Sequence, residues 1–161
     1  MKIKSLKTSF NINEFKKLKK YTEEEYKKIR NVNNPALKAQ IFFNSNGLHH
    51  LKYDNNRSER NKVVQKNKLM FFNDAVNIIK KSSTIQEYRR SIYTSDETKK
   101  IKIIKFFAFW AIISFNKKTR IKVIIRRVGG ENGKFHFWSV IPFWQLSKNK
   151  RITSSKNIEN E

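Results

Sequence analysis

The chain has no cysteine, few histidines and no long apolar run. The absence of cysteine excludes disulfides, thiolate nucleophiles and cysteine-ligated zinc. Because there are only three histidines, His49, His50 and His136, we expect no dedicated metal site and no cofactor. The longest apolar run, Phe106–Ile113, is far shorter than the roughly 20 residues of a membrane helix. We therefore expect it to form a buried strand, and we expect no membrane partner.

The first residues, Met1–Phe15, are basic but contain no apolar stretch like that of a signal peptide. A cytoplasmic location is therefore expected. The 161 residues fit one domain of ordinary size. A hydrophobic content of 38% and an aromatic content of 13% are enough to build a core, which argues against a wholly disordered chain.

Acidic residues are scarce, because 13 Asp and Glu stand against 36 Lys and Arg, a formal net charge of +23. Such a charge exceeds what solubility needs, and like charges repel in a compact state. A polyanion relieves this repulsion, and each neutralised phosphate releases counterions. Codon bias in an AT-rich genome is an alternative source of Lys and Asn, although it would not by itself suppress Asp and Glu. The charge favours a nucleic-acid partner, RNA above all.

The pattern of apolar residues predicts an α+β fold, with a helical N-terminal half packed on an antiparallel β-meander in the C-terminal third. Thr22 and Glu25 have a capping-box spacing, which indicates a helix start. A polar loop is expected over residues 52–62. Thr84 and Glu87 repeat the capping-box spacing, and a charged connector over residues 91–100 follows. Helices are expected at about Glu23–Arg30, from Pro35 to an end at Gly47, at Val63–Phe72 and at about Asp74–Lys81.

Strands are expected over residues 101–115, 120–128 and 135–143, which are rich in Ile, Val, Phe and Trp. Asn116–Thr119 would join the first pair, and the glycine-rich segment 129–133 would form the second turn. Along the second strand, Ile121, Val123 and Ile125 should face the helices. The opposite face should carry Arg120, Lys122, Ile124 and Arg126.

This basic strand face has two interpretations, a solvated outer face or a phosphate-binding face. Residues 135–143 contain no Asp or Glu that could offset the cations. If Arg126 lies opposite His136, then Lys122, Arg126, His136 and Trp138 form one patch, where a base could stack on Trp138. A register slip by one residue would bring Ser139 to that face instead. An aromatic strand is also typical of a core.

Two of the three histidines lie in Gly47–Leu51, and the loop that follows carries Lys52, Arg57 and Arg60. Histidine titrates near neutrality and can move protons at working pH, although a structural role is the alternative. Cleavage of RNA needs a base for the 2′-hydroxyl, an acid for the leaving 5′-oxygen and cations for the added charge. No metal is required for that chemistry.

The order of the segments resembles the phage-associated nucleases of the barnase–EndoU–colicin–RelE group. The likeness covers about residues 47–144, through Gly47–Leu51, Lys68–Val76, Arg120–Arg126 and Phe137–Pro142. It implies a metal-independent endoribonuclease, a toxin or mobile-element effector, that cleaves by attack of the 2′-hydroxyl on its own phosphate. His50 would match the histidine of the family's Gly-x-x-His-Leu pattern, Lys122 the strand lysine and Ser139 the serine after the Phe-Trp pair.

From this resemblance and the residue patterns we expect three regions: a helical N-terminal extension (1–46), an RNase-like α+β core (47–146) and a disordered polar tail (147–161). The expected partners are RNA, including tRNA or ribosome-associated RNA, and an acidic inhibitor protein. A non-catalytic RNA- or DNA-binding protein is the alternative. The expected catalytic residues are His50, Lys122, Arg126, His136 and Ser139, and the expected nucleic-acid-binding residues are His49, Lys52, Arg57, Arg60, Arg120, Arg127 and Trp138.

Overall fold

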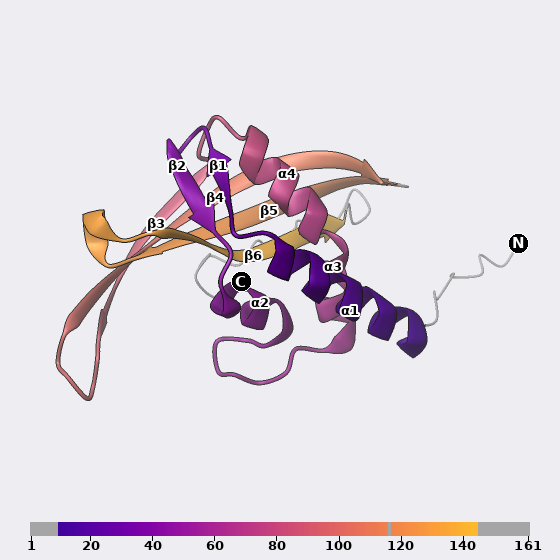
Figure 1. Cartoon of the computed structure of the whole chain (residues 1–161), viewed down its shortest axis with the longest axis horizontal. Coiled ribbons are helices and arrows are strands. Elements are labelled where there is room, and N and C mark those ends of the chain that lie inside the picture. Colours follow the sequence, from indigo (N-terminus) through magenta and orange to yellow (C-terminus); the bar gives the residue numbers. More distant parts are fainter. Residues whose placement is uncertain (1–9, 116, 145–161) are drawn as a thin grey trace, which may run out of the picture.

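The computed structural model describes residues 10–115 and 117–144, in which helices cover one face of a twisted sheet (Figure 1). The α+β prediction is confirmed, while the predicted tail (147–161) lies outside the described residues. The elements are α1 (Ile12–Lys28), β1 (Asn31–Asn34), β2 (Ala39–Phe42), α2 (Ser45–Lys52), α3 (Lys62–Met70), α4 (Phe72–Lys81), β3 (Glu87–Thr94), β4 (Ile101–Phe115), β5 (Lys117–Val128), the short 3₁₀ turn η1 (Gly130–Asn132) and β6 (Phe135–Trp144).

The sheet of the described chain has six strands in the order β1-β2-β6-β5-β4-β3. Strands β3 to β6 form an antiparallel meander, while β2 runs parallel to β6 through the pairs Ile41↔Phe135 and Phe42↔His136. The three predicted strands are confirmed, although β5 already begins at Lys117, so Lys117–Thr119 is strand rather than connection. The sheet is therefore larger than the predicted three-stranded meander and is mixed rather than purely antiparallel.

The predicted helix from Pro35 to Gly47 is wrong, because this segment holds the β1–β2 hairpin and the start of α2. The buried Asn34 side chain fixes the turn: its amide donates to the Ile79 carbonyl at 2.7 Å and its Oδ1 accepts from the Leu37 amide at 2.8 Å. Gly47 does not end a helix but lies in the first turn of α2, where Asn44 accepts its amide hydrogen at 3.1 Å.

The predicted helix at about Glu23–Arg30 is wrong at both ends. Helix α1 begins after Asn11, whose side chain accepts from the amides of the first turn and so caps the helix. Thr22 is therefore not a cap but a buried mid-helix residue, and its hydroxyl donates to the Leu69 carbonyl at 3.4 Å. The segment predicted as a helical extension thus contributes a helix and a β-hairpin to the fold.

The second capping-box prediction is also wrong, because Glu87–Thr94 is strand β3. The connector predicted over 91–100 is shorter than expected, since only residues 95–100 join β3 to β4. Backbone pairing with β4 forms this strand, from Glu87↔Ala108 to Thr94↔Ile101. Since β3 is an edge strand with little burial, its sequence carries charges where a central strand would carry apolar residues.

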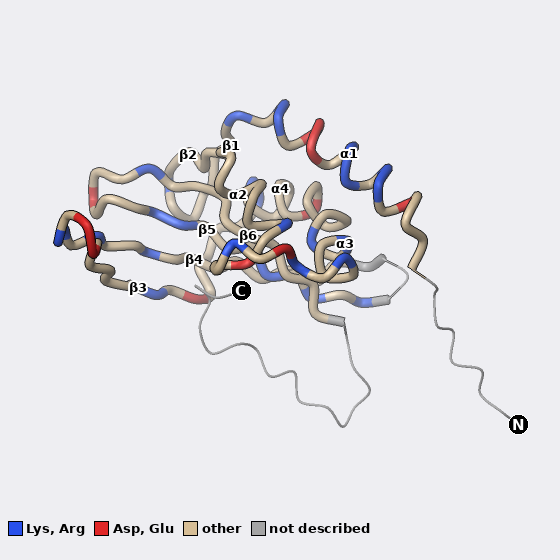
Figure 2. The backbone as a smooth tube through the Cα atoms, turned by 90° about the horizontal axis from the view of Figure 1, so that it is seen from below, with Lys and Arg blue, Asp and Glu red and all other residues tan. Residues whose placement is uncertain are grey.

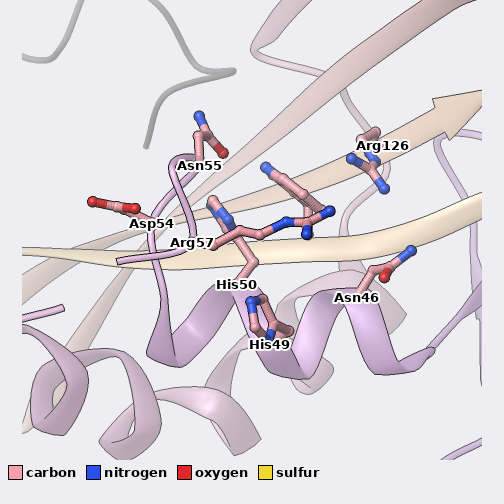
Figure 3. A pocket seen from close by; sticks show the side chains of 8 residues that line it. Asn46, His49, His50, Asp54, Asn55, Arg57 and Arg126 are labelled. Carbon is pink, nitrogen blue, oxygen red and sulfur yellow. The ribbon is translucent and has the colours of Figure 1, made fainter. Parts of the chain in front are cut away.

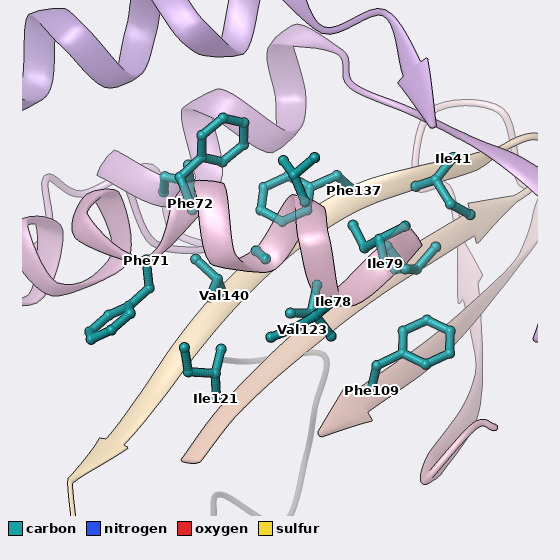
Figure 4. Close-up of a cluster of buried hydrophobic side chains, with 14 of the residues drawn as sticks. Ile41, Phe71, Phe72, Ile78, Ile79, Phe109, Ile121, Val123, Phe137 and Val140 are labelled. Carbon is teal, nitrogen blue, oxygen red and sulfur yellow. The ribbon is translucent and has the colours of Figure 1, made fainter. Parts of the chain in front are cut away.

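The main core lies between the sheet and the helices and includes Phe72, Ile79, Phe109 and Phe137 (Figure 4). As predicted, Ile121, Val123 and Ile125 of β5 point into it. A second, small cluster on the opposite sheet face contains Phe106, Ala108 and Ile124, packed by Trp138 and Ile141. The apolar run of β4 is therefore covered on both faces over residues 106–109, whereas Ile112 is 69 % exposed. Within the described residues, no helix has the length and apolar character to cross a membrane.

Candidate functional site

A pocket of about 230 Å³ opens where α2 and the loop that follows it meet the sheet (Figure 3). Helix α2 supplies both neighbouring histidines, the loop supplies a carboxylate and a guanidinium, and β5 and β6 close the opposite wall. Residues about 80 positions apart in the chain are thus brought together. The lining consists of Asn46, His49, His50, Asp54, Asn55, Arg57, Arg126 and Trp138.

A β-bulge shapes the sheet wall of the pocket. Arg126 lies opposite His136, but the register shifts before Ile124, which lies opposite Ser139, so Trp138 is the extra residue of β6. On one side of the bulge Arg126 pairs with His136, which is the first of the two registers considered from the sequence. On the other side Ser139 pairs with Ile124 of the basic strand face, as in the second register. The two registers considered from the sequence are therefore combined in one strand pair.

Trp138 is held between helix α2 and strand β5 by ring contacts. The His50 ring stacks on the indole with centroids 4.0 Å apart and an interplanar angle of 17°. The Arg126 guanidinium carbon lies 3.7 Å from the indole centroid, a cation–π contact. His50 is only 2 % exposed although it lines the pocket. The three side chains therefore form a rigid wall rather than a loose surface.

Arg60 fixes His50 from behind. Its Nη2 lies 3.2 Å from His50 Nε2, and its Nε donates to the carbonyls of His50 and Tyr53, each at 3.1 Å. A guanidinium can only donate, so Nε2 accepts and the proton of the neutral imidazole lies on Nδ1. Burial lowers the pKa of the Arg60 guanidinium, and the negative charge of Asp54 opposes this effect. Arg60 therefore positions His50 without lining the pocket itself.

The rim of the pocket is formed by His49 and the loop residues. The exposed His49 ring stacks on Tyr53 with centroids 4.3 Å apart. Asp54 accepts from the amides of Asn56 and Ser58, each at 2.9 Å, which closes a tight loop. Arg57 has a left-handed backbone (φ 61°) and extends its side chain across the pocket, while the Asp54 carboxylate points away from it (Figure 3). The rim thus presents an imidazole and a guanidinium to solvent.

Two donors in the pocket wall lack partners. Arg126 Nε and Trp138 Nε1 are buried and have no hydrogen-bond partner among the described residues. Burial also lowers the pKa of the Arg126 guanidinium, while nearby Tyr93 opposes the shift. A buried unpaired donor costs about 1–3 kcal/mol, so such groups are typical of strain or of an absent ligand. Donors of this kind suit an anionic ligand.

Lys122 does not join the pocket and is 0 % exposed. Its Nζ lies 3.2 Å from Glu87 Oε2 and 4.6 Å from the Trp110 ring centroid. The carboxylate that offsets the charge of Lys122 was not found in the neighbouring strand β6. It belongs to β3, which lies on the other side of β4. Ser139 is also buried, and its hydroxyl accepts from Lys68 Nζ at 2.8 Å. The predicted lysine and serine therefore lie in separate buried contacts.

The other predicted site residues lie outside the pocket lining. Lys52 pairs with Glu23 at 2.9 Å, and Arg120 is exposed over Trp110. Arg127 braces the β5–β6 turn, since its Nε donates to the Gly133 carbonyl at 2.9 Å and its other nitrogens contact Glu131. His136 lies beside Arg126 in the sheet. The pocket therefore gathers His49, His50, Arg57, Arg126 and Trp138 from the predicted set.

His136 provides a pH-dependent contribution to stability. Burial, and then the charge of Arg126, lower the pKa of its imidazole, although the Lys134 backbone opposes this. Because the folded state binds this proton more weakly than the unfolded chain, stability should fall as the pH drops below about 6.5. We expect His136→Gln to flatten this part of the profile in urea unfolding at a series of pH values. An unchanged slope in the variant would assign the dependence to other groups.

Sequence reasoning missed Asn46, Asp54 and Asn55. The polar loop predicted over 52–62 is confirmed except at its ends, since Lys52 belongs to α2 and Lys62 to α3. Lys and Arg outside the pocket are spread over α1, α3 and the strands (Figure 2). No cluster of three or more His, Cys, Asp or Glu able to hold a metal occurs in the described part of the chain.

No family model, curated protein or solved structure matches the chain. The residues of the pocket therefore have to indicate the function by themselves.

Proposed function

We propose that the protein is a metal-independent endoribonuclease whose substrate phosphate enters the pocket between α2 and the β5–β6 wall. One observation supports this most: two imidazoles and two guanidiniums from three separate segments line a single pocket. These groups are what cleavage by an internal 2′-hydroxyl requires, namely proton transfer and stabilisation of added negative charge. Because Arg126 lines the pocket, its guanidinium is placed to pair with the oxygens of a bound phosphate.

In the proposed reaction His49 moves the proton. It is exposed at the rim, so its ring can reach a substrate and exchange protons with water. It takes the proton of the 2′-hydroxyl as that oxygen attacks the adjacent phosphorus, and it returns the proton to the 5′-oxygen as the P–O5′ bond breaks. The products are a 2′,3′-cyclic phosphate and a free 5′-hydroxyl, so atoms and charge balance.

The remaining pocket residues stabilise the transition state in this proposal. Arg57 and Arg126 compensate the charge that develops on the non-bridging oxygens. His50 lines the pocket wall and is held through Nε2 by Arg60, so it fixes the shape of the site. Trp138 fixes the positions of His50 and Arg126, both of which pack against its ring.

The direct test is incubation of the purified protein with total RNA in EDTA. We expect fragments that end in 2′,3′-cyclic phosphate, and no cleavage of a 2′-O-methylated oligonucleotide, which lacks the attacking hydroxyl. Raising the salt concentration should weaken substrate binding steeply, because Lys and Arg outnumber Asp and Glu by 36 to 13. Intact RNA at every pH between about 5 and 8, where histidine changes charge, would count against the proposal.

A non-catalytic RNA-binding protein is the second candidate. The burial of His50 and its bond to Arg60 favour it, because these contacts also serve packing alone. This candidate predicts salt-sensitive RNA binding without new chain ends. Under the nuclease proposal the protein acts in the cytoplasm, where its RNA substrate is available. Such an activity would call for restraint by an inhibitor, and a basic protein favours an acidic one.

A further inference from the structure

A second group of aromatic and cationic side chains lies on the same open sheet face, away from the pocket. It consists of Trp110 on β4, Arg120 on β5 and Phe143 on β6, and we call it the Trp110 cluster. The Trp110 and Phe143 rings are stacked with centroids 5.3 Å apart and an interplanar angle of 27°. The Arg120 guanidinium carbon lies 4.4 Å from the Trp110 centroid. An aromatic surface and a cation are thus side by side.

Polar contacts with β3 and the residue before it hold the Trp110 ring in place. Glu87 Oε1 accepts from Trp110 Nε1 at 3.0 Å, while Glu87 Oε2 pairs with the buried Lys122. The backbone amide of Trp110 donates to Gln86 at 3.0 Å. The ring is therefore oriented before any ligand arrives, which lowers the entropy cost of binding. Core packing alone explains the burial of Lys122, but it does not explain why the exposed Arg120 lies above the Trp110 ring.

The cluster keeps a positive charge toward solvent. Glu87 matches the charge of Lys122, whereas Arg120 and Lys118 are exposed and pair with no carboxylate within the described residues. Proteins bind single-stranded nucleic acid by combining aromatic rings, on which the bases stack, with cations along the path of the nucleic-acid backbone. The cluster thus offers a base a ring surface and the adjoining phosphate a guanidinium.

The spacing along β5 connects the cluster to the pocket. Arg120 and Arg126 lie on the same face, six residues apart, which corresponds to about 20 Å in a strand. Lys122 between them is buried, so the exposed Arg120 and the half-buried Arg126 form separate contact points. A dinucleotide in the pocket cannot reach the cluster, whereas a longer strand can.

From these contacts we infer that the Trp110 cluster is a second subsite for single-stranded RNA, which stacks one base and pairs its phosphate outside the cleavage pocket. The identity of the ligand rests on the proposed function. The cluster takes no part in bond cleavage, so it affects the binding of long substrates and not the chemistry. Its affinity should depend little on sequence, because every base has a face that can stack.

The test uses a 2′-O-methylated oligonucleotide of about ten residues, within the site sizes known for single-strand binders, and the corresponding dinucleotide. Trp110→Ala should raise the Kd of the longer strand roughly tenfold, as expected for the loss of one stacked base. Arg120→Glu should raise it by a similar factor, and Trp110→Phe should largely restore it. Binding of the dinucleotide should stay unchanged in all variants. Lys81→Glu, a charge reversal at an exposed site on α4, is the matched control.

The outcomes separate this inference from the nuclease proposal. With cleavable RNA, Trp110→Ala should raise KM for long substrates and leave kcat unchanged. If wild-type protein cleaves nothing but the longer strand still loses affinity in the variants, the nuclease proposal fails and the subsite stands. If folded Trp110→Ala and Arg120→Glu both bind the longer strand like wild type, the subsite is refuted. Equal competition by polyglutamate would also refute it, because a general anion surface would then suffice. If Trp110→Ala does not fold, the exposed Arg120→Glu decides.

Discussion

Replacing His49 with alanine is expected to lower the rate of RNA cleavage by roughly 10²- to 10⁴-fold, the usual contribution of a general acid–base group. The reason is that His49 is the exposed imidazole of the pocket, whereas His50 is buried and held by Arg60. The loss should appear in kcat, because the guanidiniums of Arg57 and Arg126 remain to bind phosphate. Initial rates on a defined oligoribonucleotide in EDTA measure the effect.

The fold should tolerate this change, since the His49 side chain lies at the surface and stacks on Tyr53. Thermal unfolding of His49→Ala should therefore resemble that of wild type. Arg90→Ala on the edge strand β3 removes an exposed cation from the sheet face opposite to that of Arg126 and serves as the activity control. Cleavage by His49→Ala at the wild-type rate would remove His49 from the mechanism and leave His50 as the remaining imidazole of the pocket.

Replacing Gly47 with alanine is expected to destabilise the fold by more than about 2 kcal/mol, within the range for overpacked sites. An added Cβ would lie 2.4 Å from the Tyr26 hydroxyl oxygen and 2.5 Å from the Phe137 carbonyl oxygen. The second of these atoms is backbone, so α2 would have to move away from β6. In an unrestricted helix the same substitution stabilises by about 1 kcal/mol, so the expected sign is opposite to helix propensity.

Urea unfolding of Gly47→Ala, with Ser45→Ala in the same helical turn as the control, measures this effect. Adding Tyr26→Phe removes one of the two close oxygens and should restore part of the lost stability, a coupling that a double-mutant cycle reports. RNA cleavage should fall together with stability, because α2 carries both histidines of the pocket. A Gly47→Ala protein as stable as wild type would contradict the close packing of α2 on β6.

The three long strands could be predicted because their own residues carry the signal. Ile121, Val123 and Ile125 lie at alternate positions in a run whose other face is mostly charged, so the sequence shows both the strand and its buried face. The helices at Lys62–Met70 and Phe72–Lys81 were predicted for the same reason, since their apolar residues recur at helical spacing. In these elements local pattern and tertiary packing agree.

The hairpin of β1 and β2 and the edge strand β3 could not be predicted in this way. A four-residue strand offers too few positions for a period, and the turn at Asn34 depends on a hydrogen bond to Ile79, 45 residues away. Strand β3 is defined by pairing with β4, and its exposed side chains show no apolar alternation. Both elements arise from contacts distant in sequence, which composition does not reveal.

The candidate site was predicted in part for a related reason. The two histidines and the basic loop stand out in the sequence, and one of the two registers considered brings Arg126 and Trp138 into one patch. The separation of Lys122 from them could not be foreseen, because its partner Glu87 belongs to the unpredicted strand β3. The bulge at Trp138 likewise follows from the pairing of two strands and not from either one alone.

The long sequence distance between the two walls of the pocket has a consequence for synthesis of the protein. During translation His49 and His50 leave the ribosome before Arg126 and Trp138 have been joined to the chain. A nascent chain at that stage has the imidazoles but neither the guanidinium nor the indole that holds His50 in place. Under the nuclease proposal the pocket is therefore incomplete, and the chain inactive toward RNA, for as long as Arg126 and Trp138 have not been added.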